Sequence, residues 1–302
     1  MKALAIINII IFATSTFCYA QVLENPASSV VKFRNKIDNI KTDTDVDKLL
    51  DSIDRKRFEV FIVKEKLEIK NQKCKELAGK VQAKSWSKVD FDNNGYTDIL
   101  IIGDDFGLSS IVVLDKGKND FVIKNLTGGM FRNCAFPVVQ NVEPQPLIIY
   151  HSANESETKT LIYKFGDFVE VNKSPQKYNI QKIEYKTPGC YGTCPIFEMN
   201  IDSDRSATYK PIAFNKKQKG FLKGKIQPVQ LGELFDLLNY IDFPNLQSDY
   251  SVGGTDQQSA YLTITYDGGK VKNIADYGLR GTFALSRAYQ ILFEFRENQT
   301  WK

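Results

Sequence analysis

The chain has 302 residues, of which 42% are hydrophobic and 12% aromatic, and its formal charge of +4 comes from 40 basic and 36 acidic residues. This hydrophobic content is enough for packed cores and excludes a globally disordered chain. The near balance of charge predicts no nucleic-acid partner.

The first twenty residues have the pattern of a secretory signal peptide. Lys2 provides the positive end, residues 3–17 the apolar core, and residues 18–20 a small-residue cleavage site. We therefore expect a mature chain that is secreted or periplasmic. Lipidation of Cys18 is the alternative, against which the bulky Phe17 argues. No later segment reaches the roughly 18 apolar residues of a membrane helix, so no transmembrane segment is expected.

The next part of the chain predicts helices and then a change of pattern. Residues 28–54 have helical spacing behind a capping-type cluster at residues 42–45. The apolar positions that carry this spacing are Val46, Leu49, Leu50 and Ile53. Residues 58–69 then become strand-like.

Residues 90–98 read Asp-Phe-Asp-Asn-Asn-Gly-Tyr-Thr-Asp, with oxygen-bearing side chains at positions 1, 3, 5 and 9 and glycine at position 6. Hard cations take six to eight oxygens, and a tight loop supplies them when alternate side chains point inward around a glycine. The loop therefore predicts a structural Ca²⁺ site. Its ligands would be the side chains of Asp90, Asp92, Asn94 and Asp98 and the backbone carbonyl of Tyr96. A metal-free turn rich in Asp and Asn is the alternative.

The residues around this loop indicate strands rather than the helices of an EF-hand. Position 12 of the loop is Ile101, where an EF-hand needs a bidentate Glu, and residues 99–102 form an apolar run suited to a buried strand. A strand, this loop and an apolar strand together resemble the FG-GAP or VCBS repeat of integrin-type propellers. The resemblance covers one repeat, and it implies calcium at the loop positions named above. A propeller needs several copies, and the sequence holds no second one.

Past the loop, short apolar runs separated by turn residues predict a β-meander. The runs are residues 110–114, 120–123, 136–139, 146–150, 160–165 and 168–171. Residues 172–179 form the expected boundary. We therefore expect residues 21–174 to be a β-rich domain with N-terminal helices and the calcium loop.

Residues 180–302 mix strands and helices in the order of a smaller α+β domain. A hairpin is indicated by Asp-Gly-Gly at residues 267–269 between two alternating runs. The expected strands are residues 181–186, 196–201, 207–209, 261–266 and 270–277, and the expected helices begin at Pro228 and at Ala284. The whole chain is thus expected to be α+β.

Four cysteines remain once Cys18 leaves with the signal peptide. In an exported protein an even count indicates disulfides, here with three possible connectivities. Proximity favours Cys190–Cys194, which leaves Cys74 with Cys134.

The segment around the second pair resembles a bacterial secreted domain of unknown function. Its Cys-x-Gly-x-Cys-Pro core spans residues 190–195, and Thr255-Asp256 and the terminal helix belong to the same resemblance, which covers about residues 180–297. The resemblance implies a fold and a compartment but no chemistry.

Two enzymatic or redox alternatives stay open. Cys190 and Cys194 also resemble the copper and thiol-redox site of Sco-type proteins, although such a site uses a distant histidine and the one histidine here is His151. His151 follows the strand-like run at residues 147–150 and is expected in a polar loop. An acid-based hydrolase would need two facing carboxylates, and the sequence does not say which of 36 acids face each other.

The leading hypothesis is an exported, calcium-stabilised protein of unknown activity, which acts as a non-enzymatic binding or surface-associated module. Its partner would be an unknown protein or a cell-surface polymer. The lysine-rich residues 215–225 are expected to be a solvated loop, with contact to an anionic polymer or lipid headgroup as the alternative.

Overall fold

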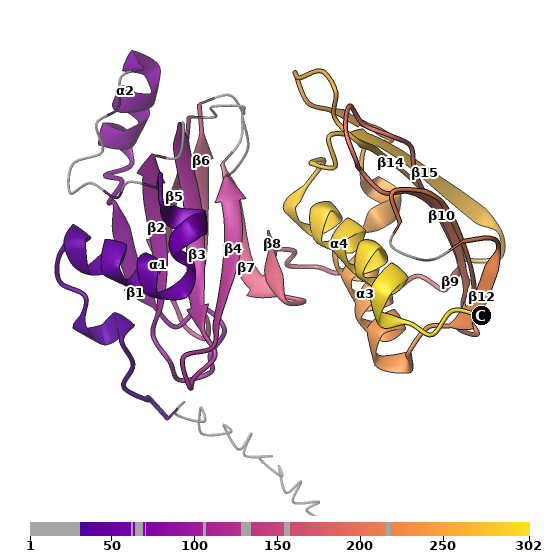
Figure 1. Cartoon of the computed structure of the whole chain (residues 1–302), viewed down its shortest axis with the longest axis horizontal. Helices are drawn as coiled ribbons and strands as arrows, with labels where there is room; N and C mark the ends of the chain where they lie inside the picture. The colour runs from indigo at the N-terminus through magenta and orange to yellow at the C-terminus, as the bar shows by residue number, and fades with distance from the viewer. Residues whose placement is uncertain are drawn as a thin grey trace, which may run out of the picture. The chain divides into compact units, whose positions relative to one another are not determined.

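The structure is a mixed α+β protein whose sheets are mostly antiparallel (Figure 1), which confirms the α+β class. It is a computed structural model that describes residues 31–61, 63, 69, 71–104, 107–127, 134–153, 158–215 and 219–302. The predicted signal peptide and Cys18 lie outside the described residues. None of the helices in the described part of the chain has the length and apolar character that a membrane crossing requires.

Two four-stranded antiparallel sheets follow one another along the chain, each in sequential strand order. The first contains β1 (Trp86–Val89), β2 (Asp98–Asp104), β3 (Leu108–Asp115) and β4 (Phe121–Thr127). The second contains β5 (Ala135–Gln140), β6 (Leu147–Ser152), β7 (Lys159–Lys164) and β8 (Asp167–Glu170).

The first sheet is buried on both faces, which explains the continuous apolar run of β2. Ile99 and Ile101 pack against a helix, α1 (Asp43–Phe58), while Leu100 points to the opposite face and packs with the second sheet. A capping box between Thr42 and Asp45 starts α1. This burial on two sides fixes β2, and with it the loop that precedes β2.

Of the strand-like prediction for residues 58–69, the described residues 58–61, 63 and 69 lie outside any strand, and the other residues of this run lie outside the described part. Phe58 is the last residue of α1, and its ring packs edge-on against Phe61 in the same core, with ring centroids 5.8 Å apart. A further helix, α2 (Gln72–Lys80), begins after Asn71, whose side chain accepts from Cys74 N. A short 3-10 helix, η1 (Ile37–Asn39), precedes α1.

The C-terminal part is built on a seven-stranded sheet in the order β12-β11-β10-β9-β14-β15-β13. Its strands are β9 (Ile180–Thr187), β10 (Ile196–Asp202), β11 (Ser206–Ala213), β12 (Leu222–Lys225), β13 (Asp249–Ser251), β14 (Ser259–Tyr266) and β15 (Lys270–Tyr277). All pairs are antiparallel except β13 with β15. β12 and β13 were not among the predicted strands.

Two helices cover one face of this sheet: α3 (Pro228–Tyr240) and α4 (Phe283–Asn298) (Figure 1). A 3-10 helix, η2 (Phe243–Asn245), follows α3. The carboxylate of Glu170 in β8 accepts the backbone N–H groups of Phe283 (2.8 Å) and Ala284 (3.0 Å) at the start of α4. Residues 32–302 form one compact unit, and the division into domains near residues 174–180 stays a prediction.

Candidate metal centre

The predicted calcium loop connects β1 to β2, where Val89 pairs with Asp98. Asp90 organises the turn, because its Oδ1 accepts Asn94 N (3.1 Å) and its Oδ2 accepts Gly95 N (2.8 Å). Gly95 has φ +90°, a left-handed conformation that glycine adopts without strain. The first acid and the glycine of the motif therefore build the bend together.

Asp98 closes the loop at the first residue of β2 and is fully buried. Its Oδ2 accepts Phe91 N and its Oδ1 accepts Asp115 N, both at 2.8 Å. These two bonds tie the loop to the end of β3. A carboxylate held this way cannot turn toward solvent.

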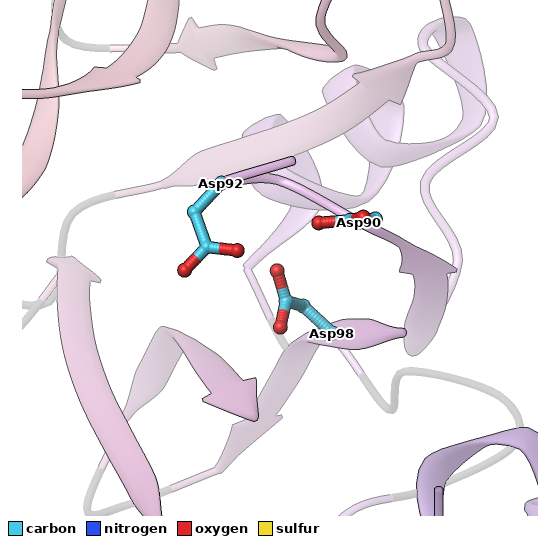
Figure 2. A group of neighbouring side chains, drawn as sticks. All are labelled: Asp90, Asp92 and Asp98. Atoms are coloured by element: carbon cyan, nitrogen blue, oxygen red, sulfur yellow. The ribbon is translucent and has the colours of Figure 1, made fainter. Parts of the chain in front are cut away.

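The side chains of Asp90, Asp92 and Asp98 converge on one small space (Figure 2). Each offers an oxygen, and these three oxygens lie within 4.8 Å of one another. Two oxygens on opposite sides of Ca²⁺ are about 5 Å apart, since Ca–O distances are about 2.3–2.6 Å. The spacing is therefore the right size for one Ca²⁺, and three carboxylates this close repel one another without a cation.

Asp92 supplies the most specific observation. Its side chain is 7% exposed, and Lys116 Nζ donates a hydrogen bond to its Oδ2. Its Oδ1 is buried and has no hydrogen-bond partner among the described residues. A buried carboxylate oxygen without a partner is unfavourable, and a bound cation would satisfy it.

The other two predicted ligands, Asn94 and Tyr96, make contacts outside the three carboxylates. Asn94 Oδ1 accepts Tyr96 N (2.7 Å), and Asn94 Nδ2 donates to Asp115 O (2.8 Å). The ring of Tyr96 stacks on Phe33, with centroids 4.9 Å apart, and covers Gly117, where a Cβ would come within 2.9 Å of it. The Tyr96 side chain is thus structural, and its backbone carbonyl is the part predicted to bind calcium.

Burial dominates the electrostatics of the cluster. It raises the pKa of Asp98 to about 8, against the opposing effect of the backbone donors and with a further increase from Asp92 and Asp90. Burial also raises the pKa of Asp90. Burial alone would lower the pKa of Lys116, but the hydrogen bond and charge of Asp92 outweigh it and the pKa is raised. Lys116 therefore stays charged beside the cluster.

Lys116 was not predicted to be part of this site. It lies between the predicted runs 110–114 and 120–123, and the turn there brings its ammonium group onto Asp92 and over the ring of Tyr163, 5.1 Å from the ring centroid. Nothing in the local sequence signals this contact, because Lys116 lies 24 residues from Asp92.

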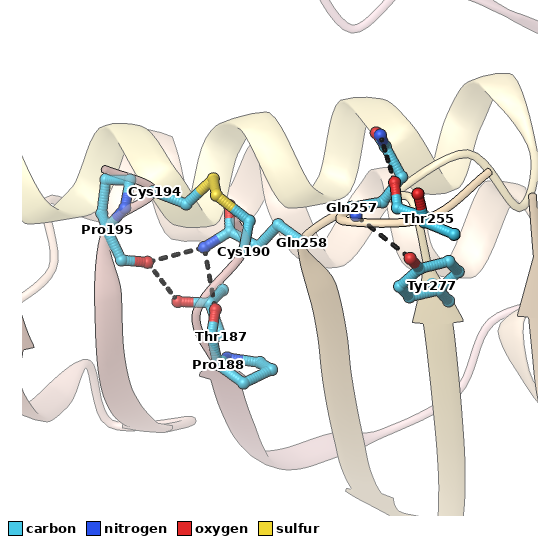
Figure 3. Close-up of a disulfide and its surroundings, with 9 residues drawn as sticks. All are labelled: Thr187, Pro188, Cys190, Cys194, Pro195, Thr255, Gln257, Gln258 and Tyr277. Atoms are coloured by element: carbon cyan, nitrogen blue, oxygen red, sulfur yellow. Dashed lines mark hydrogen bonds between the residues drawn. A yellow bond between two sulfur atoms is a disulfide. The ribbon is translucent and has the colours of Figure 1, made fainter. Parts of the chain in front are cut away.

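The four cysteines form the two disulfides favoured by their spacing, Cys74–Cys134 and Cys190–Cys194. The second joins the ends of the turn between β9 and β10 (Figure 3). Gln258 Nε2 donates to Pro195 O (2.7 Å) and to Pro188 O (3.2 Å). These bonds connect the turn to the loop that precedes β14.

The surroundings of this turn differ from those expected of a redox or copper site. Residues 196–202 after it form strand β10 and not a helix start, which would lower a thiol pKa. His151 lies within β6, not in a loop as expected, and its Nδ1 is 3.4 Å from Thr158 Oγ1. Nothing in these contacts favours the redox alternative.

A cavity of about 850 Å³ lies beside the start of α1 and along residues 83–88. Among the described residues that line it, Asp43 is the one acid, and Asp43 Oδ1 accepts Trp86 Nε1 (2.8 Å). The carboxylates with raised pKa, Asp90 and Asp98, do not line it. This cavity therefore gives the hydrolase alternative no pair of facing acids.

The comparisons with known proteins concern the C-terminal part. A family model described as a domain of unknown function (DUF6438) matches residues 181–296. This supports the resemblance to a domain of unknown function expected over residues 180–297. No FG-GAP or VCBS family model matches the chain. Neither a curated protein nor a solved structure matches it.

Proposed function

We propose that the protein is an exported, calcium-stabilised module that binds a partner or a surface and has no catalytic role. Ca²⁺ would occupy the loop at residues 90–98. It would connect the end of β1 with the start of β2 and with the turn between β3 and β4. The pattern of residues 1–20 and the pairing of the four later cysteines support export.

One observation carries the calcium assignment. Asp90, Asp92 and Asp98 each offer an oxygen within 4.8 Å of the other two, and Asp92 has a buried oxygen, Oδ1, with no hydrogen-bond partner among the described residues. A turn that needed its acids only for local hydrogen bonds would leave no such oxygen. Asp90 and Asp98 both use their oxygens in that local way, so Asp92 is the residue that separates the two interpretations.

The role of the ion is structural. The predicted ligands come from one short loop, and Asp90 and Asp98 also hold backbone N–H groups. Extracellular modules of this kind bind Ca²⁺ with Kd of about 0.1 to 1 mM. At 10 mM Ca²⁺ such affinities contribute about 1.4 to 2.7 kcal/mol to the free energy of unfolding.

Thermal unfolding in EDTA and in 10 mM Ca²⁺ tests the proposal. The wild-type melting temperature is expected to rise by about 3 to 6 °C with Ca²⁺. Asp92→Ala should abolish the increment. Asp249→Asn, which removes an exposed acid in β13, should retain it. A wild-type melting temperature that is the same in EDTA and Ca²⁺ would refute the proposal.

A further inference from the structure

The first strand of the first sheet has one edge without a partner strand. β1 stands at the end of the order β1-β2-β3-β4, and β2 is the one strand that pairs with it in the described part of the chain (Figure 1). Ser85 O accepts Ile102 N (2.7 Å), which makes these two residues a hydrogen-bonded pair. Since such pairs alternate along antiparallel strands, the backbone groups of Trp86 and Lys88 point away from β2. They have no backbone partner among the described residues.

The cavity beside the start of α1 lies along this open edge. Residues 83–88 line one side of it, and its volume of about 850 Å³ is in the range of ligand pockets, about 300–1,000 Å³. Its other walls come from both faces of the first sheet. Residues 41–44 belong to the start of α1, which packs on the face of Ile99 and Ile101. Val139 of β5 packs in the core cluster on the opposite face. The cavity therefore offers space for a further segment of chain directly beside β1.

Hydrogen bonds from β1 fix one wall of this cavity. Trp86 Nε1 donates to Asp43 Oδ1 (2.8 Å) in the first turn of α1. Lys88 Nζ donates to Asp38 O and Ile40 O, both at 3.0 Å, in the segment before α1. Both side chains lie on the same face of β1, because they are two residues apart in a strand. Bonds within the chain thus hold the start of α1 beside the open edge.

The cavity has an excess of positive charge. Its basic lining residues are Lys41, Lys84 and Lys88, and Asp43 is the one acid among the described residues that line it. Lys41 and Lys84 are exposed, and neither forms an ion pair within the described part of the chain. The half-buried ring of Trp86 lies between Lys84 and Lys88 on the same face of the strand. An extended ligand with acidic side chains would therefore meet complementary charge along this edge.

We propose that the open edge of β1 binds an extended acidic peptide segment of a partner protein by strand addition. The backbone groups of Trp86 and Lys88 would pair with the peptide backbone, and the lysines would contact its acidic side chains. The lysines would also attract an acidic polysaccharide, but a second strand alone repeats its donors and acceptors at the spacing of Trp86 and Lys88. The inference names the partner class for the binding role in the proposed function, on which it rests. It requires no Ca²⁺, so it can fail separately from the calcium assignment.

Amide hydrogen exchange measured by NMR, in EDTA on the full mature chain, tests the inference directly. In the free protein we expect fast exchange at Trp86 and Lys88 and slow exchange at Ser87 and Val89, which pair with β2. The probe is the blocked peptide acetyl-Ser-Glu-Val-Glu-Ile-Glu-Val-Ser-amide. At about 1 mM this peptide should slow exchange at Trp86 and Lys88 about tenfold or more. The inference is overturned if both amides are already protected in the free protein, or if the peptide leaves their exchange unchanged.

Two peptides with N-methyl groups at alternate residues separate strand addition from attraction by charge. Both keep every Glu side chain of the probe, but only one of them keeps the N–H groups that would face β1. That peptide should bind like the unmodified probe, and the other should not bind. Equal affinities of the two would overturn the inference. Protection of the two amides by polygalacturonate, without protection by the probe, would overturn it in favour of a polymer partner.

Lysine variants test the preference for acidic side chains. Lys41→Gln and Lys84→Gln should each weaken binding of the probe about threefold. Lys48→Gln is the matched control, because Lys48 is an exposed lysine of α1 outside the residues that line the cavity, and it should bind as the wild type does. Equal binding by all three variants would overturn the assignment of an acidic partner.

Discussion

Lys116 competes with Ca²⁺ for Asp92, and its replacement by methionine gives the sharpest prediction. The ammonium group donates a hydrogen bond to Asp92 Oδ2. The side chain of Lys116 is 29% exposed and that of Asp92 is 7% exposed. Hydrogen bonds to charged groups contribute about 1.5 to 3 kcal/mol. Because the lysine is partly exposed, we take the lower part of this range, about 1.5 to 2 kcal/mol.

Two opposite effects follow for Lys116→Met. Without Ca²⁺ the variant should be less stable by about 1.5 to 2 kcal/mol, since Asp92 loses the cation that it pairs with among the described residues and stays close to Asp90 and Asp98. Calcium affinity should rise about 10- to 30-fold, because the ammonium group no longer draws on the negative charge of Asp92 or repels a cation bound beside it. A lower melting temperature in EDTA should therefore be accompanied by a larger increment with Ca²⁺.

Isothermal titration calorimetry with Ca²⁺, combined with thermal unfolding in EDTA, measures both effects. Lys118→Met is the matched control, because Lys118 is exposed in the same turn and the substitution removes the same charge. Its affinity should stay within about twofold of the wild type. An unchanged or weaker affinity in Lys116→Met would refute the competition between the ammonium group and the ion.

Two further predictions concern pH and the start of α4. The folded-state pKa of Asp98 is raised to about 8, so without Ca²⁺ its contribution to stability is present below the unfolded pKa near 4 and is lost as the pH rises through 8. Calcium requires the ionised form, and its affinity should therefore increase about tenfold per pH unit between pH 5 and 7; equal affinities at pH 5.5 and 7.5 would contradict this. Glu170→Gln should lower the free energy of unfolding by about 1 kcal/mol in urea, since Glu170 accepts two N–H groups of α4. Glu59→Gln, an exposed position, should have no effect, and an equal loss in both would exclude the capping role.

Elements with a strong local pattern were predictable from the sequence. The hairpin of β14 and β15 lies on either side of Asp267-Gly268-Gly269, and α3 begins at Pro228 as expected. Local turn chemistry and helical periodicity determine these elements, so no distant residue is needed to specify them.

The elements that were missed depend on distant partners. β12 has lysine at alternate positions and becomes a strand through its pairing with β11 and with the chain end at Trp301. β13 is three residues long and is a strand because it pairs in parallel with β15. Neither pairing can be predicted from the residues of the strand alone.

In the candidate site, too, the local features were predictable and the contacts with distant residues were not. The alternation of acids in residues 90–98 was enough to predict which side chains converge, and the structure brings three of them together. The counter-charge from Lys116 and the contact of Tyr96 with Gly117 come from a turn about twenty residues further on. Their positions depend on how β3 pairs with β2, which the loop itself does not encode.

The central claim is that one Ca²⁺ binds at Asp90, Asp92 and Asp98, and direct measurement of stoichiometry tests it best. Calorimetric titration of the metal-free mature protein at pH 7.5 should give one Ca²⁺ per chain with a Kd of about 0.1 to 1 mM. Asp92→Ala should bind none in this range, and Asp249→Asn should bind one. The absence of binding to the wild type up to 10 mM Ca²⁺, or an unchanged stoichiometry in Asp92→Ala, would contradict the account.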